Sequence, residues 1–169
     1  MKMTAPDQET RLHDAHHESL RLWLRLLTCT LTIERRVRAR LRERFATTLP
    51  RFDLMAQLER HPQGLKMGEL SRRLMVTSGS VTGLTDQLAE EGLVERTPIP
   101  SDRRAHLVRL TARGKRAFDV MAAEHEDWVI ALFAGLSGSE RSRLQALLGR
   151  LKTTLHAADG AQPGKEARQ

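Results

Sequence analysis

The stretch VTSGSVTGLTDQLAEEGLVERTPIPSDRRAHLVRLT, residues 76–111, decides the fold because its pattern changes twice. Residues 77–80 are all small and suited to a helix start, since serine and threonine side chains can accept bonds from free backbone amides. Val81, Leu84 and Leu88 then recur at helical spacing, and Gly92 is suited to end the helix. A helix is therefore predicted over residues 77–91.

Two short strands are predicted after this helix, at Leu93 to Arg96 and at Ala105 to Leu110, with a loop that contains two prolines between them. Thr111 is suited to cap a further helix. A short helix over Lys66 to Leu74 precedes the stretch, and two short helices joined by a tight turn are typical of a helix-turn-helix. A hairpin directly behind that motif predicts its winged form.

The rest of the chain has a helical pattern, so the predicted fold class is mostly α with a small two-stranded β-hairpin. Two apolar stripes run along residues 20–45, which predicts a helix buried on more than one side and suited to a subunit interface. Thr48 starts a short helix, and Ser137 with Glu140 forms a capping box before a last helix. The predicted parts are a flexible tail (1–12), an N-terminal dimerisation helix (13–47), a winged helix-turn-helix (48–111), C-terminal dimerisation helices (112–156) and a second flexible tail (157–169).

The charge of the chain favours an anionic partner without naming it. The 169 residues carry a formal net charge of +7. Residues 20–51 hold nine arginines against Glu34 and Glu43, which equals the whole excess. One cysteine excludes an intramolecular disulfide, and the absence of an 18-residue apolar run or a secretory leader predicts a cytoplasmic protein that does not enter a membrane.

The winged helix-turn-helix predicts a double-stranded DNA partner. The second helix of such a motif places its N-terminal residues at base edges in the major groove, and the wing reaches the backbone or the minor groove. The predicted contacts on this helix are Thr77, Ser78, Gly79, Ser80, Thr82, Gly83 and Gln87. Those predicted on the wing are Arg96, Ser101, Asp102, Arg103 and Arg104, where Asp102 orients an arginine rather than touching DNA.

These segments resemble the MarR family of bacterial regulators. GELSRRLMVTSGSVTGLTDQLAEEGLVER and the wing SDRRAHLVRLTARG carry the resemblance, which extends in element order over about Leu20 to Leu155. It implies a homodimer with interlocked terminal helices, which binds a palindromic operator and represses until a ligand or oxidant releases it. Gln87 departs from the family, where a basic residue is common, so one phosphate contact is in doubt.

A small aromatic acid or its acyl-CoA thioester is the expected effector, from a weaker resemblance to a subgroup associated with aromatic-compound catabolism. The resemblance implies a cleft lined by Trp23, Arg25, Phe52, His125 and Trp128, although His125 also fits a packed core or interface histidine. Arg36, Arg38, Arg40 and Arg44 fit the phosphates of a CoA ligand, and equally fit a solvated helix face or attraction to the DNA backbone.

Alternative regulators and functions have weaker support in the sequence. Cys29 lies on an apolar stripe and is expected to pack as a small hydrophobe, which disfavours a thiol sensor. His13, His16, His17 and Glu18 offer weak metal-ligand spacing, so no metal or cofactor is expected. No nucleophile-base pair or glycine-rich phosphate loop is present, which argues against an enzyme. A non-specific architectural DNA-binding protein remains as an alternative.

Overall fold

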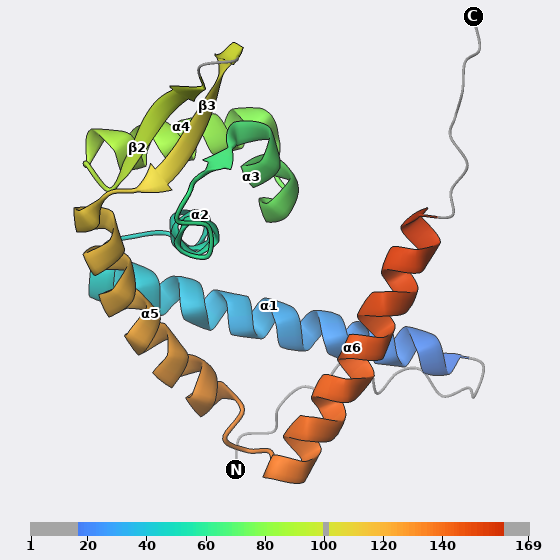
Figure 1. Ribbon diagram of the computed structural model, residues 1–169. Helices are drawn as coiled ribbons and strands as arrows, with labels where there is room; N and C mark the ends of the chain where they lie inside the picture. The colour runs from blue at the N-terminus through green and yellow to red at the C-terminus, as the bar shows by residue number, and fades with distance from the viewer. Residues whose placement is uncertain (1–16, 100–101, 161–169) are drawn as a thin grey trace, which may run out of the picture. The chain divides into compact units, whose positions relative to one another are not determined.

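The computed structural model describes residues 17–99 and 102–160, and the chain divides into two compact units between Trp128 and Val129. Helix α5 begins in the first unit and ends in the second (Figure 1). The elements of the first unit are α1 (Glu18–Phe45), α2 (Leu49–Glu59), β1 (Leu65–Lys66), α3 (Met67–Leu74), α4 (Ser78–Glu90), β2 (Val94–Ile99), β3 (Asp102–Leu110) and most of α5 (Ala112–Leu132).

The wing is larger than the sequence pattern predicted. Strand β3 pairs antiparallel with β2 on one side and with the two-residue strand β1 on the other, so the sheet has three strands in the order β1-β3-β2. Both hairpin strands also extend farther toward the tip than the predicted 93–96 and 105–110. Pro98 therefore lies in β2 and not in a loop, which an edge strand tolerates because its outer amides need no partner.

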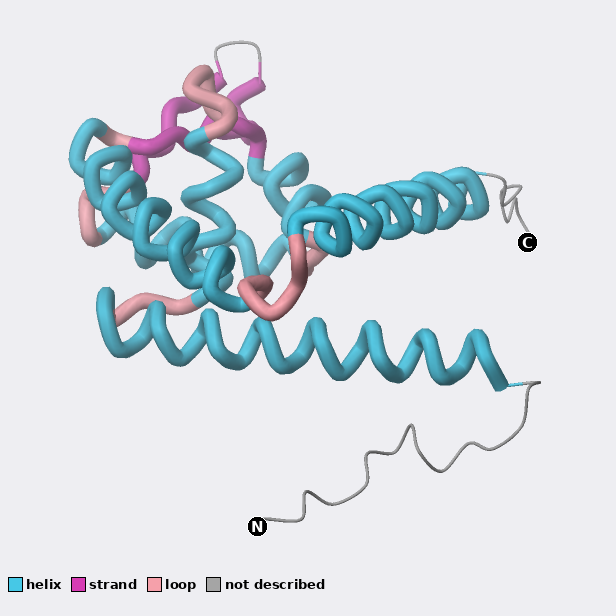
Figure 2. The backbone as a smooth tube through the Cα atoms, turned by 90° about the horizontal axis from the view of Figure 1, so that it is seen from below, coloured by secondary structure: helices cyan, strands magenta, loops and turns pink. Residues whose placement is uncertain are grey.

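The core of the first unit gathers around α2, which lies between α1 and the layer formed by the sheet, α3 and α4 (Figures 1 and 2). This placement follows from the apolar residues of α2, which project on more than one side. Leu54, Met55 and Leu58 are almost fully buried, together with Leu70 of α3, Val81 and Leu88 of α4 and Val108 of β3. The helix-turn-helix and the wing thus share one core, which fixes the wing relative to α4.

The turns around α4 form as predicted. Met75 takes a left-handed conformation (φ 54°) at the end of α3, and Thr77 in extended conformation becomes the N-cap of α4. Gly92 ends the segment at φ 69°, where glycine is favoured because a side chain would be strained. The predicted stop signal is therefore confirmed.

Among the described residues, the buried side chains of α1 lie in its C-terminal half. Val37 and Leu41 are its buried residues, whereas Trp23 and Leu31 are more than half exposed. Cys29 is exposed, so the expectation that its thiol packs is wrong for the single chain. The buried residues of α1 are Val37 and Leu41, and an apolar stripe does not reveal which part of a helix is covered.

The second unit consists of the end of α5 and α6 (Gly138–Gly160). The predicted capping box before α6 is confirmed, because the Ser137 amide donates to Glu140 Oε2 (2.8 Å) and the Glu140 amide donates to Ser137 Oγ (3.3 Å). This bonding also lowers the pKa of Glu140. Helix α6 continues past residue 157, so the predicted start of the C-terminal tail is wrong, and residues 1–12 of the other predicted tail lie outside the described residues.

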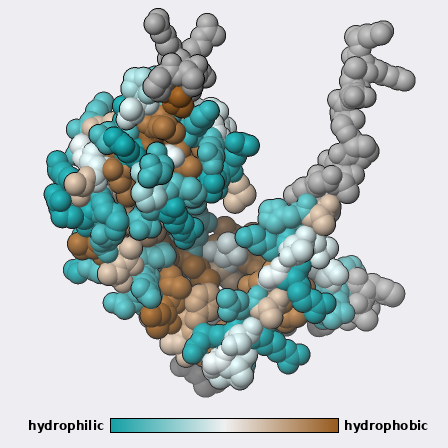
Figure 3. Space-filling view, viewed as in Figure 1, coloured by the Kyte–Doolittle hydropathy of each residue, from teal (hydrophilic) through white to brown (hydrophobic). Residues whose placement is uncertain are grey.

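Leucines on α6 present a long apolar ridge. Leu144, Leu147, Leu148, Leu151 and Leu155 are 38–58% exposed. Figure 3 shows further hydrophobic surface over the C-terminal half of α5. A groove of about 830 Å³ runs between the two helices, with Ile130, Phe133 and Leu148 in its walls. Within the described part of the chain, no helix is long and apolar enough to cross a bilayer.

Candidate nucleic-acid interface

The N-terminal turn of α4 presents small polar groups on an exposed surface. Thr77 Oγ1 accepts a bond from the Ser80 amide (3.3 Å) and lies 2.9 Å from the Ser80 hydroxyl, so the two side chains fix the start of the helix. Ser78 and Thr82 are exposed as well, and the Thr82 hydroxyl donates to the Ser78 carbonyl (3.0 Å). Backbone amides at this end carry partial positive charge, which favours an approaching phosphate.

Two glycines keep this surface open. A Cβ atom placed on Gly79 or Gly83 would meet nothing within 4 Å, so both positions leave space for a ligand at the helix backbone. Gln87, one turn farther along, is also exposed. The seven residues predicted on this helix therefore lie on the accessible surface of one element.

The wing tip is only partly described. Asp102, Arg103 and Arg104 belong to β3, and the structure describes their backbone but not their side chains; Ser101 lies outside the described residues. The predicted role of Asp102 in orienting an arginine concerns side chains outside the description. The register nevertheless places residues 102–104 at the end of the hairpin that is farthest from α5, because Val94 pairs with Leu110 at the other end.

Arg96 is tied to α4. Its Nη1 forms an ion pair with Asp86 (2.6 Å), and its Nη2 donates to the Thr82 carbonyl (3.4 Å). Only 30% of its side chain is exposed. Arg96 therefore joins the wing to the predicted DNA-reading helix, a role that the sequence pattern did not indicate.

The junction between the wing and α5 depends on a close approach. Thr111 Oγ1 accepts from the Gly114 amide (2.9 Å) and donates to the Gly92 carbonyl (2.8 Å), which confirms Thr111 as the predicted cap. A Cβ on Gly114 would lie 1.8 Å from the Leu93 carbonyl oxygen. Only glycine lets α5 begin so close to the wing, a requirement that the sequence pattern did not indicate.

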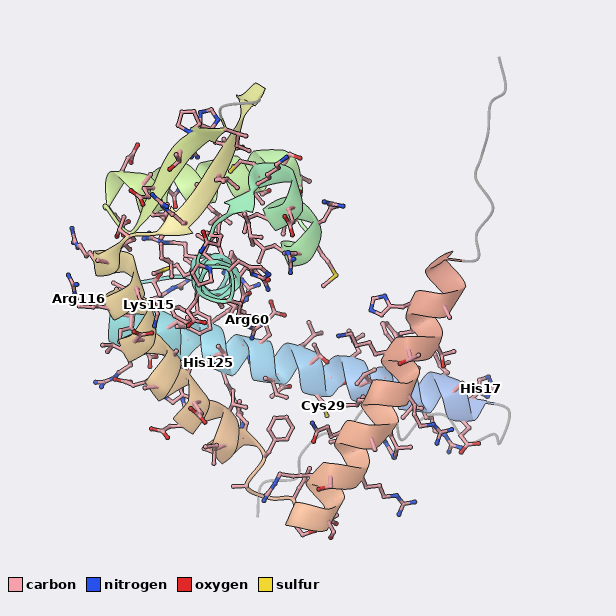
Figure 4. The ribbon with its side chains drawn as sticks, viewed as in Figure 1. His17, Cys29, Arg60, Lys115, Arg116 and His125 are labelled. Carbon is pink, nitrogen blue, oxygen red and sulfur yellow. The ribbon has the colours of Figure 1, made fainter. Side chains whose placement is uncertain are left out.

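Three of the five predicted effector residues meet in the first unit. The His125 ring lies 4.8 Å from that of Phe52 and 6.4 Å from that of Trp128, measured between centroids. Figure 4 shows His125 where α5 passes α1. Burial lowers the pKa of His125, which disfavours the charged ring at this position.

The other two predicted effector residues lie elsewhere on α1. Trp23 is 54% exposed and lies 22 residues before Phe45 on α1. The ring of Phe45 lies 6.2 Å from that of Trp128, measured between centroids. At about 1.5 Å of rise per residue, Trp23 and Phe45 are roughly 33 Å apart along α1. Arg25 is exposed near the same end. Within one chain, neither residue joins Phe52, His125 and Trp128, so the five do not form one cleft as predicted.

The arginines predicted to bind phosphate have different surroundings. Arg38 Nε donates to Glu34 (3.0 Å), Arg44 makes a bidentate pair with Glu124 (2.9 and 3.0 Å), and Arg40 lies over the Trp128 ring (5.7 Å). The guanidinium of Arg44 lowers the pKa of Glu124. Arg36 is exposed. Of the four predicted residues, only Arg38 lines the groove of about 450 Å³ on α1. They therefore do not converge on one phosphate site.

The predicted metal-ligand residues are mostly outside the description. His13 and His16 lie outside the described residues, while His17 and Glu18 are exposed at the start of α1. Among residues 17–99 and 102–160, no group of three or more His, Cys, Asp or Glu side chains is placed to hold a metal ion.

Comparisons with known proteins match part of the chain to a family. Residues 47–106 match the MarR family model. The HTH-type transcriptional regulator PecS of Dickeya dadantii (strain 3937) is 30% identical over 106 residues, which cover 62% of this chain and 64% of PecS. The chain thus spans a little under two thirds of the length of this curated relative. It spans 58% of the length of another relative, the uncharacterized HTH-type transcriptional regulator YdgJ of Bacillus subtilis (strain 168).

Solved structures agree over more of the chain. The crystal structure of a cysteine-to-serine mutant of MarR from E. coli, complexed with operator DNA, is 25% identical at a TM-score of 0.70, covering 82% of this chain and 99% of that one. Sco3205 from Streptomyces coelicolor, in complex with DNA, is 22% identical at a TM-score of 0.74 and shows the same fold over 94% of this chain and 96% of its own. By its wing, its helix-turn-helix and these matches, the chain carries a region of the MarR family at residues 47–106.

Proposed function

We propose that this protein is a DNA-binding transcriptional regulator that reads an operator with the N-terminal end of α4 and anchors itself with the wing. The observation that carries the proposal is the exposed turn of Thr77, Ser78, Gly79 and Ser80. This turn combines an unobstructed surface at Gly79 with a neighbouring wing that Arg96 ties to α4. Such an end fits the major groove, where Thr82, Gly83 and Gln87 follow along the groove wall.

The wing arginines supply the backbone and minor-groove contacts in this proposal. Arg103 and Arg104 lie on β3 at the end of the strand that is nearest the hairpin tip. An arginine in a narrow minor groove meets an enhanced negative potential, and Asp102 orients its neighbours. Arg96 holds the wing at a fixed distance from α4 through Asp86, so that both elements reach the same DNA segment.

A DNA titration tests the proposal. Replacing Arg104 by alanine should weaken operator binding by about 1–3 kcal/mol without unfolding the protein. Replacing Arg103 as well should reduce the salt dependence of DNA binding, since each lost phosphate contact lowers the number of counterions that binding releases. Arg143→Ala, at an exposed position on α6, is the matched control and should leave the titration unchanged. Equal affinities for wild type and Arg104→Ala would refute the role of the wing.

The same titration separates a regulator from an architectural DNA-binding protein. A regulator should hold its operator against competitor DNA by a factor of at least about 10³. A ratio near one would favour the architectural function.

The functional unit in this proposal is a homodimer built on the terminal helices. The leucine ridge of α6 supports it, because a monomer has no reason to expose so continuous an apolar surface. Leu148→Glu should shift the protein toward a monomer in light scattering at micromolar concentration, whereas Gln145→Glu should not. An unchanged mass for Leu148→Glu would contradict this surface as the interface.

The effector in this proposal is a small aromatic acid or its acyl-CoA thioester, which releases the repressor from DNA. Phe52, His125 and Trp128 support an aromatic site in each chain. Trp23 and Arg25 can join it only from a second copy, so the complete site needs the dimer. Thermal-shift screening of aromatic acids and their CoA thioesters, followed by operator release with each hit, tests this step, since a ligand of the native state raises its melting temperature.

A further inference from the structure

Two exposed apolar residues lie side by side in the turn of the helix-turn-helix. Met75 is 91% exposed and Val76 is 38% exposed. Every other large hydrophobic residue that is exposed in the described part of the chain lies on α1, α5 or α6. A dimer built on the terminal helices accounts for much of that surface, but the turn between α3 and α4 belongs to none of those helices.

The backbone of Met75 is strained as well. It ends α3 in the left-handed conformation (φ 54°), and its amide donates to the Arg72 carbonyl (3.3 Å). Glycine usually occupies such a position because it has no Cβ, as Gly92 does after α4 (φ 69°). Met75 thus combines a strained backbone with an apolar side chain in water, and both raise the free energy of the unbound protein. A residue with these two properties is a candidate for a contact that forms only in a complex.

The turn is held in place beside the proposed DNA surface. The Ser71 hydroxyl donates to the Val76 carbonyl (2.6 Å), and the Val76 amide donates to the Ser71 carbonyl (3.2 Å). The next residue, Thr77, is the N-cap of α4. Met75 and Val76 therefore directly precede the exposed residues 77–80, at the end of α4 that enters the major groove in the proposed function.

The chemistry of the first turns of α4 narrows the base that these side chains contact. Residues 77–86 contain no Arg, Lys, Asn or Gln, the side chains that form paired hydrogen bonds with guanine or adenine. The thymine C5 methyl is the apolar group that a base pair presents in the major groove. We propose that Met75, flanked by Val76, packs against a thymine methyl group in each operator half-site and thereby selects a T·A pair there. The inference rests on the proposed function, because it requires α4 to lie in the major groove.

A series of methyl deletions in the DNA tests the contact. An operator duplex is first selected with the full chain from a random pool. Each thymine is then replaced in turn by deoxyuridine, which removes the methyl group and keeps the hydrogen-bonding groups of the base. At one position in each half-site, the replacement should weaken binding about fourfold, the usual effect of losing one buried methyl group. In Met75→Gly the same replacement should have no effect, whereas Met75→Leu keeps an apolar side chain and should keep the discrimination.

Stability separates a DNA contact from a structural role. Met75→Gly relieves the left-handed strain and removes an exposed side chain, so the midpoint of urea denaturation should rise while operator affinity falls at least about fourfold. Ala46→Gly is the matched control, because Ala46 is also exposed and also left-handed (φ 49°), at the end of α1. It should raise the midpoint and leave operator affinity unchanged. A residue that only held the turn would instead lose stability and affinity together on substitution.

Three results would overturn the inference. The first is a selected operator that binds equally well with deoxyuridine at every thymine. The second is discrimination between thymine and deoxyuridine that persists in Met75→Gly, and the third is a Met75→Gly protein whose urea midpoint falls together with its operator affinity. Failure to select any specific duplex would contradict the proposed function itself, and this inference would fall with it. The two kinds of failure are distinguishable, because the three results require a specific operator and the last outcome yields none.

Discussion

Replacing Gly114 by alanine tests whether the close approach of α5 to the wing is a requirement of the fold. The new Cβ would lie 1.8 Å from the Leu93 carbonyl oxygen, 2.8 Å from the Leu93 carbonyl carbon and 3.1 Å from its Cα. All three are backbone atoms, so no side-chain rotation can relieve the overlap. Ordinary contact begins at 3.4 Å, which requires the two backbones to separate by about 1.6 Å.

The expected cost follows from what the separation breaks. Leu93 O accepts from the Thr111 amide (3.1 Å), and Gly114 N donates to Thr111 Oγ1 (2.9 Å). Overpacking costs about 1–3 kcal/mol and a lost hydrogen bond about 1 kcal/mol, while replacing a helical glycine returns about 0.5–1 kcal/mol. The free energy of unfolding should therefore fall by about 1–3 kcal/mol.

Urea denaturation at one fixed protein concentration measures this change, since association contributes to the apparent stability. Gly83→Ala is the matched control: its Cβ would meet nothing within 4 Å, so it should stabilise α4 by about 0.5–1 kcal/mol. A Gly114→Ala protein as stable as the wild type would refute the argument from close approach.

Three further predictions concern α4 and the aromatic group. Thr77→Ala should lower the unfolding free energy by about 1 kcal/mol in urea denaturation, because it removes the N-cap acceptor of the Ser80 amide, and an unchanged midpoint would contradict the cap. In a double-mutant cycle, Asp86→Ala and Arg96→Ala should show a coupling of about 0.5–1 kcal/mol in stability, whereas additive effects would mean that the pair is not formed in solution. Burial lowers the pKa of His125 below its unfolded value, so its contribution to stability is present above about pH 6.5 and is lost as the pH falls toward the folded pKa. Lowering the pH from 7.5 to 5.5 should therefore reduce the free energy of unfolding of the wild type more than that of His125→Phe. Parallel plots of unfolding free energy against pH for the two proteins would contradict the lowered pKa.

The sequence predicted elements that depend on local chemistry. The cap at Thr77, the stop at Gly92 and the capping box of Ser137 and Glu140 each depend on residues a few positions apart. The winged fold class followed from the order of these signals. Strand β1 was missed because two residues carry no alternation, and its pairing with β3 joins segments more than 40 residues apart.

The parts of the site that depend on contacts between distant residues were not predictable. The ion pair of Arg96 with Asp86 and that of Arg51 with Glu91 both join residues on different elements, and charge alone does not select a partner. Trp23 was grouped with Trp128 although the length of α1 separates them within one chain. Cys29 was expected to pack because it lies on an apolar stripe, yet it is exposed. Such a stripe shows which side of a helix is covered but not which part of the helix length is covered.

The pairing of β3 divides the wing into two mechanical parts. Leu107 and Val108 are held from both sides, by β1 and by β2, whereas His106 pairs with β2 alone. The base of the wing is therefore held by strands on both sides, whereas His106, farther out, is held on one side only. Amide hydrogen exchange should then be faster at His106 than at Leu107, because strands held on one side open more readily than strands held on both.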